Sequence, residues 1–351
     1  MVFVGFGVHA PELGHDDYAK VDVTGKIVVV LFDAPKGFES TIRAHYSAWS
    51  VKCDAAARHG AVGLIQLATP QLLKAYPWPM LTVDTSREVT WVDAAGPRRG
   101  TAAPLQLTGW LSDAAAAHVF AATALRPDEL FGRAARGEQI PAADLGVALT
   151  VDMVSLHRRY ESANVAAILR GDDLRDEFVV YSAHLDHLGI GRELGGDTTY
   201  NGALDNASGV AGMLAVARAF TRLASKPRRS ILFVAVTAEE VGLVGSDYFA
   251  RHPPVPVDAI AANVNIDILP LLYDFAEVVA LGAEHSTMAA MVQQAAAKLG
   301  VNVVPDHMPD EGFFVRSDHY SFVRQGIPAV YTYEGRRAVD TSVDAAARMA
   351  E

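Results

Sequence analysis

Short apolar runs alternate with segments of helical periodicity over the second half of the chain. Continuous apolar runs between polar or turn residues are typical of buried strands, and apolar residues at helical spacing predict helices between them. The predicted strands are 165–169, 178–183, 230–237, 260–266 and 328–333, and the predicted helices are 206–224, 243–252 and 285–299. Because this alternation needs crossover connections, it predicts an α/β fold with a mostly parallel sheet between helices.

The first part of the chain has more mixed elements. Apolar runs predict strands at 26–32, 61–67 and 80–83, and helices are expected at 44–59 and 112–125. Gly60 would end the first of these helices, and Ser112 or Asp113 would cap the second. Segment 126–143 is rich in Pro, Gly and charge, so we expect a domain boundary near residue 150 that separates domains 1–149 and 150–351.

Composition limits the class of protein. Half of the 351 residues are hydrophobic and a fifth are charged, which is enough to form a core. The net charge of −11 argues against general nucleic-acid binding, because phosphate backbones attract clustered Lys and Arg. No apolar run reaches the roughly 18–20 residues that span a bilayer. The single cysteine, Cys53, excludes an internal disulfide framework and a Cys-rich zinc ribbon.

Acidic and histidine residues gather where the predicted strands end. They lie in His184-Leu185-Asp186-His187 after strand 178–183, at Asp205 before a helix, at Glu239-Glu240 after strand 230–237, at Asp267, and in Ser317-Asp318-His319 before the last strand. Sites in open α/β sheets lie beyond the carboxyl ends of the strands. We therefore expect these side chains to converge on one edge of the sheet.

The chemistry of this residue set favours metal binding. Two histidines with several carboxylates form an N/O ligand set that suits Zn²⁺, with Mn²⁺ or Co²⁺ as lesser possibilities. Crowded carboxylates repel one another, and two divalent cations would neutralise them. Two metals about 3.5–4 Å apart polarise a carbonyl and lower the pKa of a shared water, which is the apparatus of amide hydrolysis.

The motifs resemble those of the co-catalytic two-zinc aminopeptidases, a metallopeptidase family that includes glutamate carboxypeptidase II. The matching motifs are His184-Leu-Asp186-His-Leu-Gly, Gly202-Ala-Leu-Asp205-Asn-Ala-Ser-Gly209, Ala238-Glu-Glu240-Val-Gly-Leu, Asn265-Ile-Asp267 and Ser317-Asp-His319. They occur in the family's order and cover roughly residues 160–335. Residues 1–145 more weakly resemble the protease-associated (PA) domain that many members carry. The resemblance implies a three-layer α/β/α catalytic domain with a smaller α+β accessory domain.

The resemblance also implies a role for each site residue. Asp205 would bridge two Zn²⁺ ions, with His184 and Asp267 on one ion and Glu240 and His319 on the other. Glu239 would be the general base that takes a proton from a metal-bridging water, and the peptide bond after Asp205 would be cis. Asp186 would orient His184, since a metal-bound imidazole usually hydrogen-bonds a carboxylate through its other nitrogen.

The implied activity is that of a zinc exopeptidase, most simply an aminopeptidase that acts on peptides as a monomer. A carboxypeptidase or glutaminyl cyclase on the same scaffold stays open, as does a non-catalytic binding protein. Relatives are often exported, so an extracytoplasmic location is expected. The abrupt start at Met1 and the short tail 336–351 suggest a chain truncated at both ends.

Simpler interpretations compete with each assignment. Any one of the five ligands alone could be an ordinary polar residue at a strand end, but the five together fit that interpretation poorly. His187 has no ligand role in the family, and His307 fits loop decoration better than metal binding. Tyr320 could steady an oxyanion, but packing explains it better. Rival chemistries lack their signatures: there is no Gly-x-Ser-x-Gly elbow, no helical His-Glu-x-x-His, and the glycines near Gly189 do not form a dinucleotide fingerprint.

Overall fold

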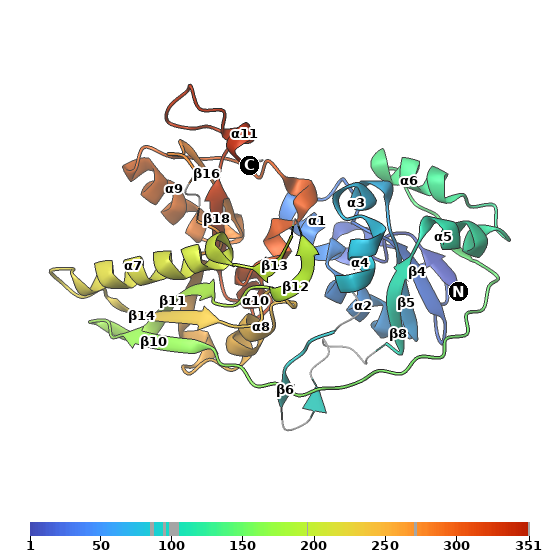
Figure 1. Cartoon of the computed structure of the whole chain (residues 1–351), viewed down its shortest axis with the longest axis horizontal. Coiled ribbons are helices and arrows are strands. Elements are labelled where there is room, and N and C mark those ends of the chain that lie inside the picture. The colour runs from blue at the N-terminus through green and yellow to red at the C-terminus, as the bar shows by residue number, and fades with distance from the viewer. Residues whose placement is uncertain (85–87, 94–95, 98–104, 195, 270–271, 350–351) are drawn as a thin grey trace. The chain divides into compact units, whose positions relative to one another are not determined.

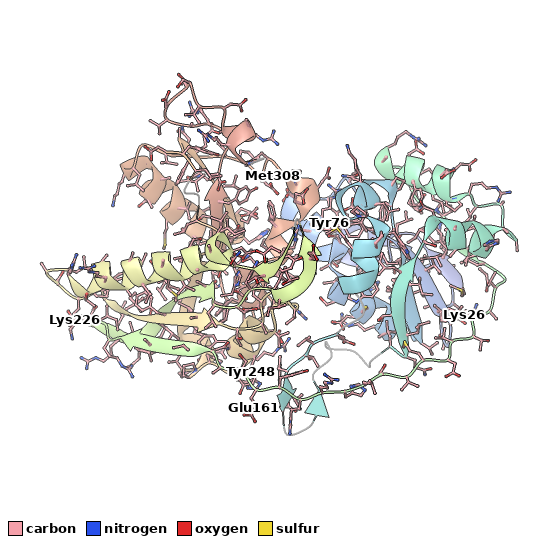
Figure 2. All side chains as sticks on the ribbon, in the orientation of Figure 1. Lys26, Tyr76, Glu161, Lys226, Tyr248 and Met308 are labelled. Carbon is pink, nitrogen blue, oxygen red and sulfur yellow. The ribbon has the colours of Figure 1, made fainter. Side chains whose placement is uncertain are left out.

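The computed structural model divides the chain into two compact units, Met1–Arg158 and Arg159–Glu351 (Figure 1). It describes residues 1–84, 88–93, 96–97, 105–194, 196–269 and 272–349. The expected boundary near residue 150 lies slightly before the division between the units. Figure 2 shows the side chains of both units, with Lys26 in the first and Lys226 in the second.

The first unit is built on a five-stranded sheet in the order β8-β5-β4-β1-β9. Its strands are β1 (Val2–Val4), β4 (Ile27–Leu31), β5 (Gly63–Leu67), β8 (Leu107–Leu111) and β9 (Ala142–Asp144). All neighbours pair in parallel except β9, which is antiparallel to β1. Two short hairpins accompany the sheet: β2 (His9–Ala10) with β3 (His15–Asp16), and β6 (Val92–Asp93) with β7 (Gly96–Pro97).

Helices cover both faces of this sheet because successive strand residues point to opposite sides. On one face, Phe3 and Leu31 pack with Phe120 and Leu130; on the other, Val28 packs in a second core with Ala56. The helices are α1 (Ser40–Ser47), α2 (Trp49–Arg58), α3 (Pro70–Ala75), α4 (Trp78–Asp84), α5 (Asp113–Phe120) and α6 (Pro127–Ala135). The Ser112 hydroxyl caps α5 by accepting from the Ala115 N–H at 3.3 Å, as the sequence predicts.

Two expectations for the first unit are wrong. The helix expected at 44–59 is two helices, because Ala48 adopts extended backbone angles, φ −59° and ψ 132°, between them. The strand expected at 80–83 lies inside helix α4. A short apolar run cannot separate a strand from a helix by periodicity, and Pro79 in the first turn suits a helix start.

The second unit holds a seven-stranded sheet in the order β10-β14-β11-β15-β18-β16-β17. The strands are β10 (Val165–Leu169), β11 (Leu174–His184), β14 (Arg229–Val236), β15 (Ile260–Asn265), β16 (Glu277–Leu281), β17 (Asn302–Val303) and β18 (Ala329–Glu334). The four central strands β14, β11, β15 and β18 run parallel, while β10 and β16 are antiparallel to their central neighbours. A separate hairpin joins β12 (Gly189–Leu194) and β13 (Asp197–Tyr200).

Helices form a layer on each face of the seven-stranded sheet. Phe178 and Val234 pack on one face against Phe249 of α8 (Val244–Arg251) and Phe322 of α10 (His319–Val323). Phe233 on the other face packs against Met213 of α7 (Gly209–Thr221). Helix α9 (Met288–Lys298) shares the face of α7, since its core cluster includes residues on that side of β15 and β18. The expected three-layer α/β/α sandwich is confirmed.

The sequence located the central strands but missed several peripheral ones. Strands β1, β8, β9, β16 and β17 and the β12–β13 hairpin were not expected; β1, β9 and β17 have only three, three and two residues, too few for a period to show. A short helix, α11, spans Ala345–Met349. Within the described residues, no helix combines the length and apolar character that a membrane crossing requires.

A buried lysine connects the elements of the first unit. Lys52 of α2 is fully buried, and its Nζ donates to the carbonyl oxygens of Phe6, Leu31 and Asp33 at 2.5, 3.2 and 2.6 Å. These contacts satisfy all three ammonium hydrogens. Desolvation nevertheless disfavours the charged form and lowers the pKa of Lys52 to about 8.

We predict that Lys52→Met lowers the free energy of unfolding by about 2–4 kcal/mol, because three buried carbonyls lose their donor. The pKa of about 8 in the folded state lies below the value of about 10.4 for an unfolded lysine. The unfolded state therefore binds more protons between these values, and Lys52 should make the wild type gain stability as pH rises through that window. Denaturant unfolding of both proteins at several pH values measures the difference. A stability gap independent of pH would contradict the pKa, and no gap would contradict the role of the contacts.

Candidate metal centre

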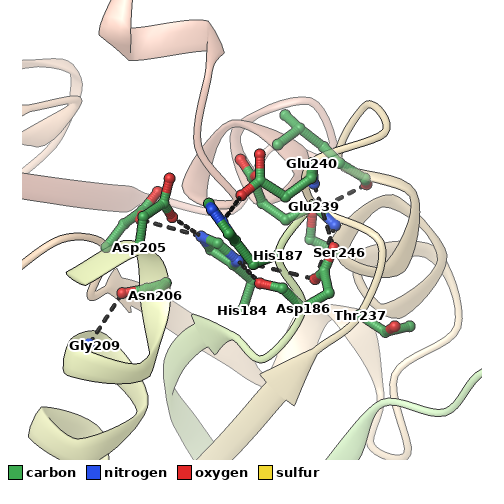
Figure 3. Close-up of polar contacts among 12 residues, drawn as sticks. His184, Asp186, His187, Asp205, Asn206, Gly209, Thr237, Glu239, Glu240 and Ser246 are labelled. Atoms are coloured by element: carbon green, nitrogen blue, oxygen red, sulfur yellow. Dashed lines mark hydrogen bonds and ion pairs between the residues drawn. The ribbon is translucent and has the colours of Figure 1, made fainter. Parts of the chain in front are cut away.

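The parallel strands bring the predicted site residues to one edge of the second sheet. His184 is the last residue of β11, and it pairs with Val236, the last residue of β14. Glu239 follows β14, and Asp267 follows β15, which pairs with β11 on its other side. Because parallel strands end at a common edge, residues far apart in sequence meet there. Figure 3 shows the resulting cluster.

His184 forms one group with Asp205 and Asp267, whose ligand atoms all lie within 4.8 Å of one another. The His184 Nε2 atom lies 3.0 Å from Asp205 Oδ1 and 3.2 Å from Asp267 Oδ1. The other ring nitrogen, Nδ1, lies 3.1 Å from the backbone carbonyl oxygen of Asp186, to which it can only donate. With its proton on Nδ1, a neutral ring would face two carboxylates with a lone pair, so a cation or a second proton is needed at Nε2.

The pKa of His184 also indicates that positive charge is favoured at its Nε2 atom. The side chain is 1% exposed, and burial alone would disfavour a charged ring. The hydrogen bonds to Asp205 and Asp267 outweigh this effect and raise the pKa of His184 to about 12. A divalent cation at this point would replace that proton and neutralise both carboxylates.

Asp205 is presented by an irregular turn before α7. It lies in a π-helical segment, Ala203–Ser208, but its own backbone angles are non-helical, and its peptide bond to Asn206 is cis, as expected. Buried Asn206 holds the turn, because its Nδ2 donates to the Ile266 carbonyl and its Oδ1 accepts from the N–H groups of Gly209 and Ile268. Asn206 thus links the Asp205 turn to the backbone on both sides of Asp267.

Gly209 is required at the start of α7. A Cβ atom there would lie 2.2 Å from the Asn206 Oδ1 atom and 2.6 Å from the Ile266 carbonyl oxygen. Both distances are far below a normal contact, so any larger residue would displace Asn206. The glycine of the motif therefore serves the close approach of α7 to the site.

A buried chain of polar side chains orients Asp267. The Ser317 hydroxyl donates to Asp267 Oδ2 and accepts from Asn265 Nδ2 at 2.7 Å. Asn265 Oδ1 in turn accepts from the Ser182 hydroxyl at 2.7 Å. Ser317 belongs to the motif quoted for His319, so the structure gives this motif a role in holding Asp267.

Asp186 holds the glutamate pair. Its two carboxylate oxygens accept from the backbone N–H groups of Glu239 and Glu240 at 3.2 and 3.4 Å. We expected this carboxylate to orient His184, but it lies 3.9 Å from Nδ1, and the backbone carbonyl of Asp186 makes that contact instead. The chain turns after β11 in such a way that the Asp186 carboxylate faces the backbone N–H groups after β14, and so it does not contact His184.

Glu239 is the more buried of the two glutamates. Desolvation, reinforced by the negative charge of the fully buried Asp318, raises the pKa of Glu239 well above its ordinary value. Burial also raises the pKa of Asp318. A carboxyl group that holds a proton this readily is suited to exchange one with a substrate. Glu239 also forms a group with His184 and Glu240 in which each side chain offers one ligand atom.

Another group of potential ligands, which also contains Asp205, combines it with His187 and Glu240. The His187 Nδ1 atom lies 2.5 Å from Glu240 Oε1, and Figure 3 shows the imidazole directed at this carboxylate. Burial and the charge of Asp205 raise the pKa of Glu240, and the contact with His187 opposes them. Asp205 is therefore common to two groups, one with His184 and one with His187.

His319 is not brought to the cluster. It begins α10, is fully buried, and belongs to none of the groups of potential ligands among the described residues. Its two ring nitrogens have no hydrogen-bond partner in the part of the chain that the structure describes, and burial lowers its pKa to about 3. The expected pairing of His319 with Glu240 is thus not present, because the motif turns Ser317 toward Asp267 and His319 into the core.

Sequence reasoning missed three residues of the site: His187, Asn206 and Ser317. All three lie inside the motifs that were recognised, beside residues with assigned roles. For His187, its position next to Asp186 in the first motif could have indicated a place in the site. Spacing along the chain, however, does not show where a side chain points after a strand ends. The donor set itself, imidazole nitrogens with carboxylate oxygens, suits zinc.

The sequence comparison identifies the second unit. The profile of Peptidase family M28 matches residues 164–349, which include both groups of ligands. The chain belongs to peptidase family M28.

Relatives of this M28 chain include proteins named as aminopeptidases. It is 35% identical over 123 residues to Aminopeptidase NAALADL1 of Mus musculus, covering 33% of this chain and 15% of that protein. It is 28% identical over 189 residues to Probable leucine aminopeptidase 2 of Aspergillus fumigatus, covering 52% of this chain and 35% of that protein. A solved aminopeptidase of Aneurinibacillus sp. strain AM-1 aligns with a TM-score of 0.46 and 19% identity over 96% of this chain and 66% of that one. The chain therefore spans well under half the length of the two curated relatives.

For this M28 chain we predict that Asn206→Ala loosens the site as well as the fold. The substitution leaves buried backbone donors and an acceptor unpaired, which should lower the free energy of unfolding by about 2–4 kcal/mol. Zinc affinity should fall as well, because Asp205 and Asp267 lose their common support. Denaturant unfolding and zinc titration measure the two effects, with Asn201→Ala at an exposed position as the matched control. Unchanged stability and zinc affinity would remove Asn206 from the site's support.

Proposed function

We propose that this chain is the catalytic part of a metallo-aminopeptidase that hydrolyses the first peptide bond of a peptide. The observation that carries the proposal is the pair of ligand groups that share Asp205 and adjoin the buried Glu239. One group is His184, Asp205 and Asp267, and the other contains Asp205 and Glu240. The ordinary alternative, a set of unrelated polar residues at strand ends, does not account for a shared carboxylate.

The proposed division of labour follows from the contacts. His184, Asp205, Asp267 and Glu240 would hold two zinc ions, which when bound polarise the scissile carbonyl and lower the pKa of water. Glu239 would take the proton of the attacking water and return it to the leaving amine nitrogen. Asp186 would keep Glu239 and Glu240 in place through their backbone N–H groups. Ser317 and Asn206 would position Asp267 and Asp205 without contacting the substrate.

An apolar pocket beside Asp267 supports a preference for hydrophobic residues in the substrate. The pocket has a volume of ≈ 210 Å³ and is lined by Ile266, Asp267, Leu269, Phe275, Val278, Thr332 and Tyr333. Side chains of this type bind apolar groups through the area they remove from water. We propose that the side chain of the N-terminal residue enters this pocket while its peptide carbonyl lies near the metal ligands.

The names of the relatives favour an aminopeptidase over a carboxypeptidase or a glutaminyl cyclase. Two of them carry the word aminopeptidase. For the first unit we propose a protease-associated accessory domain, which rests on the resemblance of residues 1–145. An extracytoplasmic location and a monomeric state stay predictions. Assays with aminoacyl-p-nitroanilides, N-terminally blocked dipeptides with a free C-terminus, and peptides with an N-terminal glutamine separate the three activities.

Substitution of the two adjacent glutamates should affect kcat and zinc binding differently. Glu239→Gln keeps the shape of the side chain and removes the proton acceptor, so we predict a loss in kcat of at least ~10²-fold with zinc content near that of the wild type. KM should change little, because the interaction acts mainly in the transition state. Glu240→Gln should instead weaken the binding of one zinc ion, and excess zinc should partly restore activity.

Elemental analysis after dialysis and aminopeptidase kinetics test this prediction, with the exposed Glu284→Gln as the matched control. A Glu239→Gln protein that loses zinc while Glu240→Gln keeps two ions would reverse the roles. Asp205→Ala should release both ions of the M28 centre. If folded wild-type protein binds no zinc, the proposed function itself is wrong.

A further inference from the structure

The second ligand group lacks the imidazole that the sequence motifs assign to it. His319 lies among aromatic rings, with centroid distances of 5.5 Å to Phe314 and 5.6 Å to Tyr331. It is fully buried, and it is absent from the groups of potential ligands among the described residues. A side chain enclosed in this way would have to leave the core to reach Glu240.

His187 lies where that imidazole is needed. Its Nδ1 atom is 2.5 Å from Glu240 Oε1, and it offers a ligand atom within 4.8 Å of those of Asp205 and Glu240. The His187 side chain is 22% exposed, so an ion from solvent can reach it. Figure 3 shows His187 between the turn that carries Asp205 and the turn that carries Glu240.

The backbone is built to admit His187 at this point. Gly202 has a left-handed conformation, φ +67°, and a Cβ atom there would lie 2.7 Å from the His187 Cβ atom. The Gly202 carbonyl also accepts from the Ala207 N–H at 3.0 Å, which closes the turn around Asp205. The segment that presents the shared carboxylate therefore packs directly on His187.

We infer that His187 is the imidazole ligand of the second metal position, together with Asp205 and Glu240. This inference rests on the proposed function. It gives the two positions the same donor set: His184, Asp205 and Asp267 on one side, His187, Asp205 and Glu240 on the other. Catalytic zinc sites have three protein ligands, drawn from imidazole, carboxylate and thiolate groups, and leave a coordination place open.

A hydrogen bond between His187 and Glu240 without any metal is the competing explanation. Cobalt(II) titration of metal-free full-length protein, followed by visible spectroscopy and elemental analysis, distinguishes the two. His187→Ala should lower the affinity for one of two ions at least ~10-fold, since even groups behind the ligands contribute about 10–100-fold. His187→Gln can still hydrogen-bond Glu240 but lacks the imidazole, so it should behave like His187→Ala.

Replacement by another ligand gives a direct signature. His187→Cys should retain both cobalt ions and add a near-ultraviolet thiolate-to-cobalt charge-transfer band, since thiolate is a ligand for such ions. The wild type, whose only cysteine is Cys53, is the control for this band. His118→Ala at an exposed position of α5 controls for the loss of any histidine, and His319→Gln should bind as many ions as the wild type.

The outcomes separate this inference from the proposed function. An unchanged number of tight ions in His187→Ala, no new band in His187→Cys, or a loss of one ion in His319→Gln would each overturn the role of His187 while the proposed function stands. A folded wild type that binds no cobalt overturns both. A His187→Gln protein that binds one ion fewer than the wild type supports the assignment and excludes a role limited to hydrogen bonding.

A different observation points to a separate metal site in the first unit. His9, Asp16 and His59 offer ligand atoms that all lie within 4.8 Å of one another. The β2–β3 hairpin pairs His9 directly with Asp16, and the His9 Nδ1 atom lies 3.3 Å from Asp16 Oδ1. His59 follows α2, and its ring is held by stacking on Tyr18 at 4.3 Å with 4° between the planes.

We propose that His9, Asp16 and His59 bind one zinc-like divalent ion that connects the β2–β3 hairpin to the end of α2. Two imidazoles and one carboxylate are a common protein ligand set for such ions, and solvent can supply the remaining ligands. The hairpin is short and its His9 side chain is 38% exposed, so an ion from solvent can reach this side chain and would fix its position. This site is independent of the M28 centre.

Zinc titration of the Asp205→Ala protein tests this site with the catalytic centre weakened. His9→Ala and His59→Ala in that background should each bind one ion fewer, and zinc should raise the Tm of the parent more than that of either variant, because binding to the folded state stabilises it. His118→Ala should match the parent. Equal zinc stoichiometry in the parent and in both variants would overturn the proposal.

Discussion

The carboxylate of Asp205 is the shared element on which the candidate site depends. It lies 3.0 Å from His184 Nε2, and it also belongs to the group of His187 and Glu240. Buried carboxylates this close repel one another and favour either protons or cations between them. The raised pKa values of His184 and Glu239 show this repulsion, because both groups hold a proton more tightly beside the other carboxylates. Under the proposed function, two divalent ions would neutralise these carboxylates and leave Glu239 free to accept a proton.

Hydrogen bonds from neighbouring residues hold the closely spaced carboxylates of the site in place. Asn206 joins the Asp205 turn to the strand end that carries Asp267, and Ser317 and Asn265 extend that support into the sheet. Asp186 performs the same task for the glutamates through two backbone contacts. Each support is a buried hydrogen bond between segments distant in sequence, so the site is only as ordered as the packing of the sheet. This explains why motif residues such as Asp186, Asn206 and Ser317 serve the site although they are not in the groups of potential ligands among the described residues.

The sequence predicted the frame of the site better than its details. The central strands and the acids at their ends were expected, because buried parallel strands are continuous apolar runs and parallel strands share an edge. His319 was assigned to Glu240 by motif order, yet the structure buries it against Phe314 and Tyr331. The strand expected at 80–83 is helix α4, since a short apolar run suits either element.

By itself, the sequence determined the alternation of strands and helices, the chemical type of the donors and the membership of the chain in peptidase family M28. These follow from local periodicity and from motifs that are contiguous along the chain. Only the tertiary structure decided which imidazole lies beside Glu240 and that the Asp186 carboxylate holds a turn instead of His184. Those choices depend on where the chain turns after each strand and on what space its neighbours leave. Gly202 and Gly209 control that space, and no pattern in the sequence states which side chain will fill it.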